Sequence, residues 1–230
     1  MSDAEELKEA AARTKRILED LRRQGIVSVP SSVRAEPVEA RTASADKATA
    51  LEPVRLQAMD CKLCKLCKER NSVVFGDGTL DARLVFVGEG PGRDEDKQGT
   101  PFVGAAGQLL NKIIVAMKMD RPEVYICNIV KCRPPNNRPP EEDEIASCMP
   151  YLEQQLAVIQ PKVICALGKT AASALLESEA PMSAMRGRTF ERNGIPLVVT
   201  YHPAYLLRNP AAKKDVWEDM QKVLAILKGA

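Results

Sequence analysis

The chain has 230 residues, which suits one domain with appendages or at most two small domains. Its 45% hydrophobic and 28% charged residues are ordinary for a globular protein, so wholesale disorder is excluded. No apolar run approaches the roughly 18 residues that a membrane span needs, and the N-terminus is polar and acidic, so we predict neither a membrane protein nor an exported one. The net charge of +2 neither requires nor excludes a nucleic-acid partner.

The N-terminal part of the chain is expected to lie outside the main domain. Residues 1–25 predict a helix, running over residues 3–24, because Ser2 and Glu5 match a capping box and apolar residues form a stripe up to the following glycine. We favour a surface helix here over an element that binds a protein partner. Residues 26–55 collect Pro, Ser, Ala and charged residues without a sustained apolar period, which predicts a flexible linker.

The rest of the chain alternates short apolar runs with helix-like stretches. The predicted strands cover residues 84–87, 124–130, 163–167 and 197–200, and the predicted helices lie near 105–118, 141–158, 169–178 and 213–228. Strands that are apolar on both faces and alternate with helices indicate the α/β class, with a parallel sheet covered on both sides. Ligands of such folds bind beyond the carboxyl ends of the strands, so the residues just after each run are the candidates for function.

The first predicted strand ends in a loop rich in glycine and proline, Gly88-Glu89-Gly90-Pro91-Gly92. A dinucleotide-binding fingerprint needs its glycines to open directly into a helix. Because Pro91 and a charged run intervene, and because we expect the helix to begin only near Ala105, we set that interpretation aside. A tight loop of this kind suits close backbone approach to a flat or phosphorylated ligand. Phe102 follows in the same region, where its ring is either a core plug or a ligand contact.

Two polar side chains stand at the ends of other predicted strands. Asn128 lies inside an apolar run, where an unpartnered amide costs about 1–3 kcal/mol, so it either satisfies local backbone or faces a ligand. His202 is the only histidine of the chain and comes directly after the last predicted strand. That placement favours a catalytic over a structural role.

Seven cysteines, an odd number, favour a cytoplasmic metal site over a disulfide framework. Cys127 and Cys165 lie in predicted strands, which indicates inert core thiols. With a single histidine in the chain, any metal site must be rich in thiolates.

Cys61 and Cys64 form a C-x2-C pair, Cys67 follows three residues later, and Cys132 and Cys148 are dispersed. Zinc and an iron–sulfur cluster both suit thiolate ligands. One C-x2-C pair with two dispersed cysteines favours a [4Fe–4S] cluster over a zinc ribbon, although the spacing alone leaves both open.

Three motifs, GEGPGRDEDKQGTPFVGAAGQLL, NIVKCRPPNNR and HPAYLLRNP, occur in this order together with the spaced cysteines. The chain resembles the family 4, or iron–sulfur, uracil-DNA glycosylases over about residues 58–228. The resemblance implies a three-layer α/β/α sandwich around a four-stranded parallel sheet, in a glycosylase domain that we place at residues 56–230. It also implies a [4Fe–4S] cluster on Cys61, Cys64, Cys132 and Cys148, with Cys67 outside the ligand set.

The resemblance further implies removal of uracil from DNA in base excision repair, leaving an abasic site. Phe102 would stack on the flipped uracil, Asn128 would pair with its N3–H and O4, and His202 would donate to O2 as the glycosidic bond breaks. The main-chain amides around Gly90 would also face the base.

The resemblance leaves open which carboxylate, if any, orients the attacking water. Many relatives carry an Asp where this chain has Gly90, so the carboxylate either comes from elsewhere or is dispensable. Glu89 and Glu95 are the candidates. We prefer Glu95, for orienting water or for excluding a methyl group, although a charged run such as RDEDK is most often a solvated surface.

The expected partner is uracil-containing DNA, single- or double-stranded, and we expect a monomer that works at the nucleoid of a bacterial or archaeal cell and has no membrane contact. Arg133 and Arg138 in the loop 133–140 would contact phosphates. Leu206, Leu207 and Arg208 would form a wedge that enters the duplex, unless the leucines are a buried pair capped by a surface arginine; the sequence supports both equally.

Two other functions are weighed against this one. A relative that crosslinks to the abasic product would need a second, nucleophilic histidine, which this chain lacks. A non-catalytic module associated with lesions or polymerases would keep the cysteines and basic loops but has no need for Phe102, Asn128 and His202 together.

Overall fold

The structure, a computed structural model, describes residues 38–229, with side chains from residue 45 onward. The chain divides into two compact units, residues 1–41 and residues 42–230, and the sheet lies in the second unit. The helix predicted over residues 3–24, with its partner role, lies outside the described residues. None of the described helices is long and apolar enough to cross a membrane.

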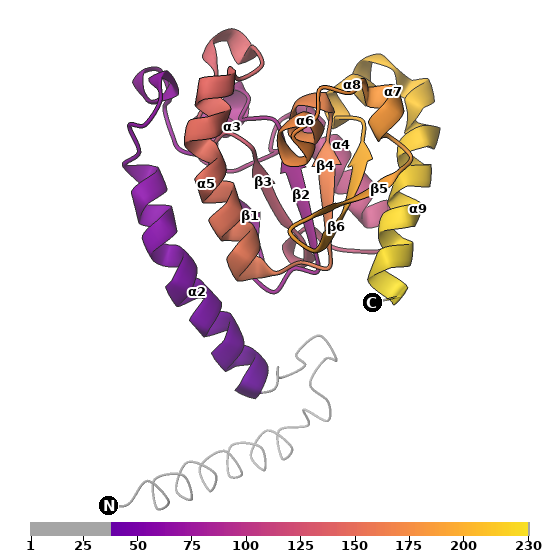
Figure 1. Cartoon of the computed structure of the whole chain (residues 1–230), viewed down its shortest axis with the longest axis horizontal. Coiled ribbons are helices and arrows are strands. Elements are labelled where there is room, and N and C mark those ends of the chain that lie inside the picture. The colour runs from indigo at the N-terminus through magenta and orange to yellow at the C-terminus, as the bar shows by residue number, and fades with distance from the viewer. Residues whose placement is uncertain (1–37, 230) are drawn as a thin grey trace, which may run out of the picture. The chain divides into compact units, whose positions relative to one another are not determined.

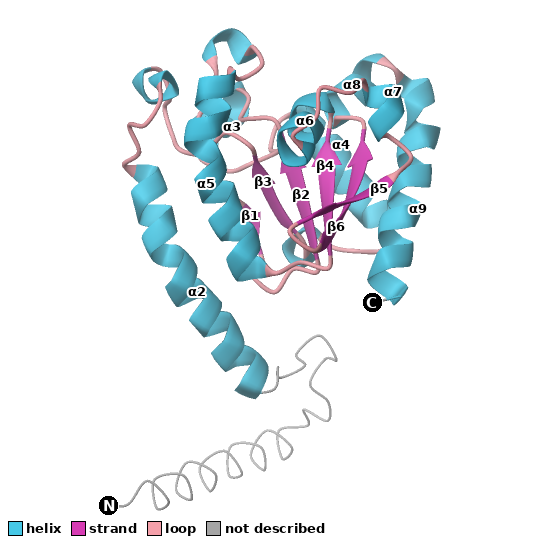
Figure 2. Ribbon diagram, in the orientation of Figure 1, coloured by secondary structure: helices cyan, strands magenta, loops and turns pink. Residues whose placement is uncertain are grey.

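A single mixed sheet forms the centre of this unit (Figures 1 and 2). Its strands are β1 (Asp77–Gly78), β2 (Leu84–Gly88), β3 (Tyr125–Asn128), β4 (Val163–Leu167), β5 (Thr189–Arg192) and β6 (Ile195–Thr200), in the spatial order β1-β3-β2-β4-β6-β5. Strands β3, β2, β4 and β6 run parallel, and the edge strands β1 and β5 pair antiparallel to their neighbours. The α/β class and the four parallel strands are confirmed, but the sheet has six strands rather than four.

The two edge strands escaped prediction because neither is buried on both faces. β1 is two exposed residues long, and β5 alternates exposed with half-buried positions. β5 and β6 are joined by Asn193 and Gly194, both at positive φ, 50° and 80°. Asn-Gly with left-handed backbone at both positions is the preferred two-residue hairpin turn. This dipeptide was the one sequence signal for the β5–β6 hairpin.

Helices cover both faces of the sheet (Figure 1). The longer ones are α2 (Val38–Met59), α4 (Ala105–Ala116), α5 (Glu142–Ile159), α6 (Lys169–Leu176) and α9 (Lys213–Gly229). β2 shows how the layers form, because its side chains alternate between the faces. Leu84 and Phe86 pack into the core that includes residues of α4 and α9, whereas Val85 and Val87 pack into the core that includes residues of α2, α5 and α6. The predicted three layers and the four predicted helices are confirmed.

Helix α2 corrects the prediction of a flexible linker over residues 26–55, since its residues 38–55 are helical. Leu51, Val54 and Ala58, spaced by three and four residues, are all buried against the core. The sequence does not reveal this buried face, because α2 contains Pro53 and many polar residues and has no strong apolar stripe as a whole. Tertiary packing of three side chains therefore decides a structure that local propensity does not predict.

The charged run after the first strand is also helical, as α3 (Arg93–Gln98), which begins directly after Gly92. The prediction that no helix begins before Ala105 was wrong. Acidic residues in the first turn of α3 favour a helix N-terminus. Asp96 is fully buried and accepts a hydrogen bond from the backbone N–H of Asn71 at 2.8 Å, so the run is a docked element rather than a solvated surface. Two more short helices, α7 (Met182–Met185) and α8 (Pro203–Arg208), were not predicted.

Candidate active site

The carboxyl ends of the parallel strands surround a cavity of about 480 Å³, here called the strand-end cavity. Its lining residues are Glu89, Gly90, Pro91, Gly92, Glu95, Phe102, Ala106, Asn128, Pro134, Asn137, Arg138, His202, Ala204, Tyr205 and Arg208. They come from the end of β3, from helices α3 and α8, from the start of α4 and from the loops that follow β2, β3 and β6. Parallel strands place their carboxyl ends at one edge of the sheet, which is why residues so far apart in the sequence meet here.

Phe102 is nearly buried, with 6% of its surface exposed. Gly88, the last residue of β2, leaves room for it: a Cβ on Gly88 would lie 2.6 Å from Cζ of Phe102 and 2.4 Å from Oδ1 of Asn128. The Phe102 ring and the Asn128 amide therefore both lie against this glycine. The geometry places a flat apolar surface and an amide in the same cavity.

Asn128 ends β3 with 1% of its surface exposed. Among the residues that the structure describes, none donates a hydrogen bond to its Oδ1 atom. A buried acceptor without a partner is costly, and native structures rarely keep one without a functional reason. This amide does not satisfy local backbone through its oxygen, which leaves that oxygen available to a ligand.

His202 is held in one tautomer by its position at the N-terminus of α8. Its Nδ1 atom accepts a hydrogen bond from the backbone N–H of Ala204 at 3.1 Å, which leaves the proton of the neutral ring on Nε2. Burial, and secondarily the positive charge of Arg208, lowers the pKa of His202 to about 4, although Glu95 acts in the opposite direction. The imidazole is therefore neutral near pH 7, with one N–H to donate. Its ring lies 5.6 Å from the Phe102 ring, centroid to centroid.

The two candidate carboxylates differ in what they already bind. Oε1 of Glu95 accepts hydrogen bonds from the backbone N–H groups of Val103 and Gly104, both at 2.9 Å. Oε2 of Glu89 accepts one hydrogen bond, from the Thr170 hydroxyl. Both carboxylates line the strand-end cavity. Glu95 thus shapes the loop that carries Phe102, and Glu89 has fewer bonds to backbone.

A second group of predicted residues meets away from this cavity. Cys61, Cys64, Cys132 and Cys148 line one narrow pocket together with Cys67, the cysteine pocket. All five thiols are free of disulfide bonds. Within residues 45–229, no group of three or more His, Cys, Asp or Glu side chains is arranged to hold a metal ion. The structure therefore brings the predicted thiols together without setting out a coordination geometry.

The chemistry of the cysteine pocket fits thiolate ligands. Nη1 of Arg70 donates to Sγ of Cys132 at 3.2 Å, and the backbone N–H of Lys131 donates to Sγ of Cys148 at the same distance. N–H donors aimed at sulfur are the usual surroundings of a metal-bound thiolate. Cys127 and Cys165, in contrast, are fully buried in strands β3 and β4, as predicted for core thiols.

Comparison with known proteins decides the family. The model of the uracil DNA glycosylase superfamily matches residues 75–221. The type-4 uracil-DNA glycosylase of Thermotoga maritima is 44% identical over 182 residues, which cover 77% of this chain and 95% of the relative. That of Sulfurisphaera tokodaii is 43% identical over 182 residues, covering 75% and 83%. A type-5 enzyme of Pyrobaculum aerophilum is 32% identical over 146 residues, covering 56% and 64%.

The chain belongs to the type-4 uracil-DNA glycosylases. The region that matches the superfamily contains every residue that lines the strand-end cavity. Cys61 and Cys64 precede that region, so the superfamily match does not include two of the four predicted ligands.

The prediction of a DNA wedge that includes both Leu206 and Leu207 needs a correction. Leu206 is 1% exposed and packs in the core beside α9, whereas Leu207 is 50% exposed. Adjacent residues of helix α8 point in different directions, so only one of the two leucines can meet DNA. Tyr205, which the sequence analysis did not single out, is 38% exposed, stacks on Tyr201 and lines the strand-end cavity.

The arginines that were predicted to contact phosphates line two neighbouring cavities. Arg208 and Arg138 line the strand-end cavity. Arg138 is already committed to a two-pronged pair with Glu144, at 2.8 and 2.7 Å. Arg133 lines a neighbouring cavity of about 500 Å³ and donates from Nε to the Asn137 side chain at 2.7 Å.

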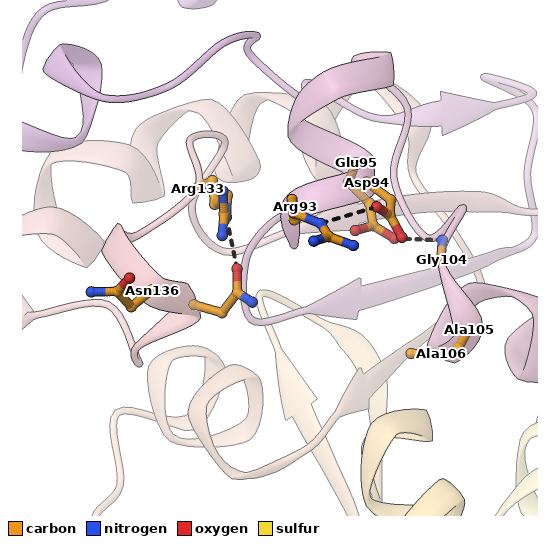
Figure 3. A pocket seen from close by; sticks show the side chains of 9 residues that line it. Arg93, Asp94, Glu95, Gly104, Ala105, Ala106, Arg133 and Asn136 are labelled. Atoms are coloured by element: carbon orange, nitrogen blue, oxygen red, sulfur yellow. Dashed lines mark hydrogen bonds and ion pairs between the residues drawn. The ribbon is translucent and has the colours of Figure 1, made fainter.

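Figure 3 shows this neighbouring cavity between the loop of Arg133, the start of α3 and the start of α4. Arg93 and Asp94 form an ion pair there, and the backbone N–H of Gly104 reaches Glu95, as the dashed lines mark. Glu95, Ala106 and Asn137 line both cavities, so the two lie next to each other.

Proposed function

We propose that the strand-end cavity receives a uracil flipped out of DNA and that the enzyme hydrolyses its N-glycosidic bond. Family membership supports this activity, a step of DNA repair that releases uracil and leaves an abasic site. The observation that carries the assignment of the pocket is the unpartnered Oδ1 atom of Asn128 beside the Phe102 ring. A glycosylase must extrude its target base and read it by stacking and by hydrogen bonds.

Asn128 supplies the hydrogen bonds that select uracil. Its Oδ1 accepts the N3–H of the base and its NH2 donates to O4. Cytosine presents an acceptor at N3 and a donor at N4, so the same amide orientation meets it with two mismatches. Phe102 supplies the stacking face, and the backbone around Gly90 closes the cavity.

His202 stabilises the leaving group. As the bond from C1′ to N1 breaks, its electron pair passes into the uracil ring and charge develops on O2. The neutral imidazole donates its Nε2–H to that oxygen, in the manner of an oxyanion hole. Because the pKa of His202 is lowered to about 4, the donor is in place without a prior protonation.

A water molecule completes the reaction: its oxygen bonds to C1′ as the bond to N1 is lost, and its proton neutralises the departing uracil anion. We assign its orientation to Glu89, which Thr170 holds by one hydrogen bond. Glu95, the carboxylate that the sequence analysis preferred, has one oxygen occupied by two backbone amides, so its role is to fix the Phe102 loop.

Cys61, Cys64, Cys132 and Cys148 would hold a [4Fe–4S] cluster. Four free thiols on one pocket, two of them with N–H donors at sulfur, fit such a group. When bound, the cluster ties the segment after α2 to the loop after β3 and to α5. No step of uracil excision passes through it.

DNA approaches along the mouth of the cavity. We assign phosphate contacts to Arg133, Arg138 and Arg208, and the wedge to Leu207 beside Tyr205. We propose that the enzyme works as a monomer on the DNA of the nucleoid.

The test uses a labelled oligonucleotide with a single uracil. Incubation followed by alkali should cut the strand at the uracil, and an oligonucleotide with thymine or cytosine at that position should stay intact. A covalent protein–DNA adduct that survives denaturation would indicate the crosslinking relatives instead. Binding without cleavage would indicate a non-catalytic module.

A further inference from the structure

Phe102 has an unusual backbone conformation for the residue that stacks on the base. Its φ is 53°, in the left-handed region that residues with a Cβ rarely adopt. Such a conformation persists only where the surroundings hold it. The position of the ring depends on this angle, because φ and ψ of Phe102 set the direction of its side chain.

Arg121 holds the peptide groups on both sides of Phe102. Its Nη2 donates to the carbonyl of Pro101 at 2.6 Å, and its Nη1 donates to the carbonyl of Phe102 at 3.2 Å. These two carbonyls belong to the two peptide planes that meet at the Phe102 Cα. A guanidinium bonded to both planes therefore restricts φ and ψ of this residue together.

Arg121 is itself fixed by two further bonds. Nη1 donates to Oδ1 of Asn111 at 2.9 Å, and Nη2 pairs with Oδ2 of Asp77 at 3.3 Å. The planar fork of an arginine suits several simultaneous bonds, which a lysine ammonium cannot reproduce at the same points. Arg121 comes from the short turn before β3 and lies outside the residues that line the strand-end cavity.

Two other features hold the same loop from other sides. Glu95 accepts from the N–H of Val103, which lies in the peptide plane that also contains the Phe102 carbonyl. Gly107 of α4 lets that carbonyl approach the helix, because a Cβ on Gly107 would lie 1.9 Å from the Phe102 oxygen. Unlike Glu95, Arg121 does not line the strand-end cavity.

We propose that Arg121 is a positioning residue for uracil recognition, acting through the backbone of Phe102. The inference rests on the proposed function, since it requires Phe102 to stack on the base. Loss of the guanidinium frees the two carbonyls, releases φ and ψ of Phe102 and weakens stacking. Aromatic stacking on a base contributes roughly 5- to 150-fold in affinity, and Arg121 controls part of that factor.

The experiment is a double-mutant cycle on the full chain. Arg121→Gln, Phe102→Ala and the double variant are compared with the parent protein in single-turnover excision from a single-stranded uracil oligonucleotide. Inhibition by free uracil gives the affinity of the pocket for the base, and thermal unfolding gives stability. Arg121→Lys is a second variant, which keeps the charge beside Asp77 if the glutamine variant does not fold.

Arg192→Gln is the matched control. Arg192 also bonds a backbone carbonyl, that of Leu175 at 2.8 Å, and two carboxylates, those of Glu153 and Glu177. It lines a different cavity from the one that binds uracil. Its loss should lower the unfolding temperature without changing excision or uracil inhibition measured well below that temperature.

The proposal predicts that Arg121→Gln lowers two quantities by the same factor, roughly 10-fold. These are the excision rate at low substrate concentration and the affinity for free uracil as an inhibitor. In the Phe102→Ala background the same change should cost less than about 2-fold. Arg121→Lys should fall between the parent and the glutamine variant. Full activity of the Arg121 variants, or an equal loss with and without Phe102, would overturn the inference. An unimpaired Phe102→Ala protein would instead overturn the assignment of the pocket, and the inference with it.

Discussion

The Nδ1 atom of His202 accepts the backbone N–H of Ala204, two residues further along the chain, at 3.1 Å. This bond caps the N-terminus of α8 just after β6, and it decides which ring nitrogen carries the proton. The Nε2–H is left for a ligand. His202 is thus held by a contact within the chain while it lines the strand-end cavity.

Replacing His202 by alanine should lower single-turnover excision by about 10²–10³, the usual effect of losing one oxyanion-type donor. Binding to a non-cleavable uracil analogue should change far less, because the charge on O2 develops only during bond cleavage. Quench-flow or manual sampling under enzyme excess measures the rate. A variant that excises at the parent rate would assign leaving-group stabilisation to another residue.

The pH profile of the parent protein tests the charge state of the same ring. Because burial lowers the pKa of His202 to about 4, the ring is neutral above about pH 5 and its Nδ1 keeps the bond to Ala204. The contribution of His202 to the rate should be constant from about pH 5 to 8 and should be lost as the pH falls through 4. A step near pH 6.5 that His202→Asn abolishes would contradict the neutral donor.

The two adjacent leucines of α8 should behave differently. Leu206→Ala removes a buried side chain and should destabilise the fold by about 2–5 kcal/mol, measured by denaturant unfolding. Leu207→Ala removes an exposed side chain and should leave stability unchanged, while slowing excision from duplex DNA more than from single strands. Equal effects of Leu207→Ala on excision from both substrates would contradict a role for Leu207 as the wedge.

The cysteine pocket should yield iron and acid-labile sulfide when the protein is purified without oxygen, with broad absorption near 400 nm, at roughly the wavelength of thiolate-to-iron charge transfer. Cys148→Ala should lower the stability of the fold more than the rate of uracil excision, because it removes one link between segments that are distant in the sequence. Cys127→Ala, at a buried thiol outside the pocket, is the control and should keep the colour. Colourless protein with stoichiometric zinc would exclude the cluster.

The features that were predicted correctly are those for which one segment of the sequence is sufficient. The parallel strands are buried on both faces and read as continuous apolar runs, such as residues 163–167. Asn128 and His202 stood out because each is an unusual residue at or just after a strand end, and Phe102 because it is an aromatic residue in a glycine-rich region. The structure then brought them to one cavity, as the rule for parallel sheets requires.

The parts that were missed depend on contacts between distant segments. Helix α2 forms because Leu51, Val54 and Ala58 meet the core, and the linker prediction considered only the local composition. Arg121 looks like an ordinary surface arginine until the loop of Phe102 folds onto it. Two adjacent leucines carry no period, so the sequence could not tell buried Leu206 from exposed Leu207.

Asn128→Asp tests the central claim, that this amide selects uracil. Asp keeps the shape of the side chain but loses the donor, so uracil O4 would face a carboxylate in a desolvated pocket. Uracil excision should fall by several orders of magnitude, while cytosine N4–H gains an acceptor and a protonated Asp can also donate to N3.

The measurement is single-turnover release of both bases by Asn128→Asp between about pH 5 and 8, the range in which a carboxyl pKa raised by burial shows. We predict that uracil release collapses and that weak cytosine release appears, strongest at the acid end. Undiminished uracil release by this variant would show that Asn128 is a structural amide and that the strand-end cavity does not read the base through it.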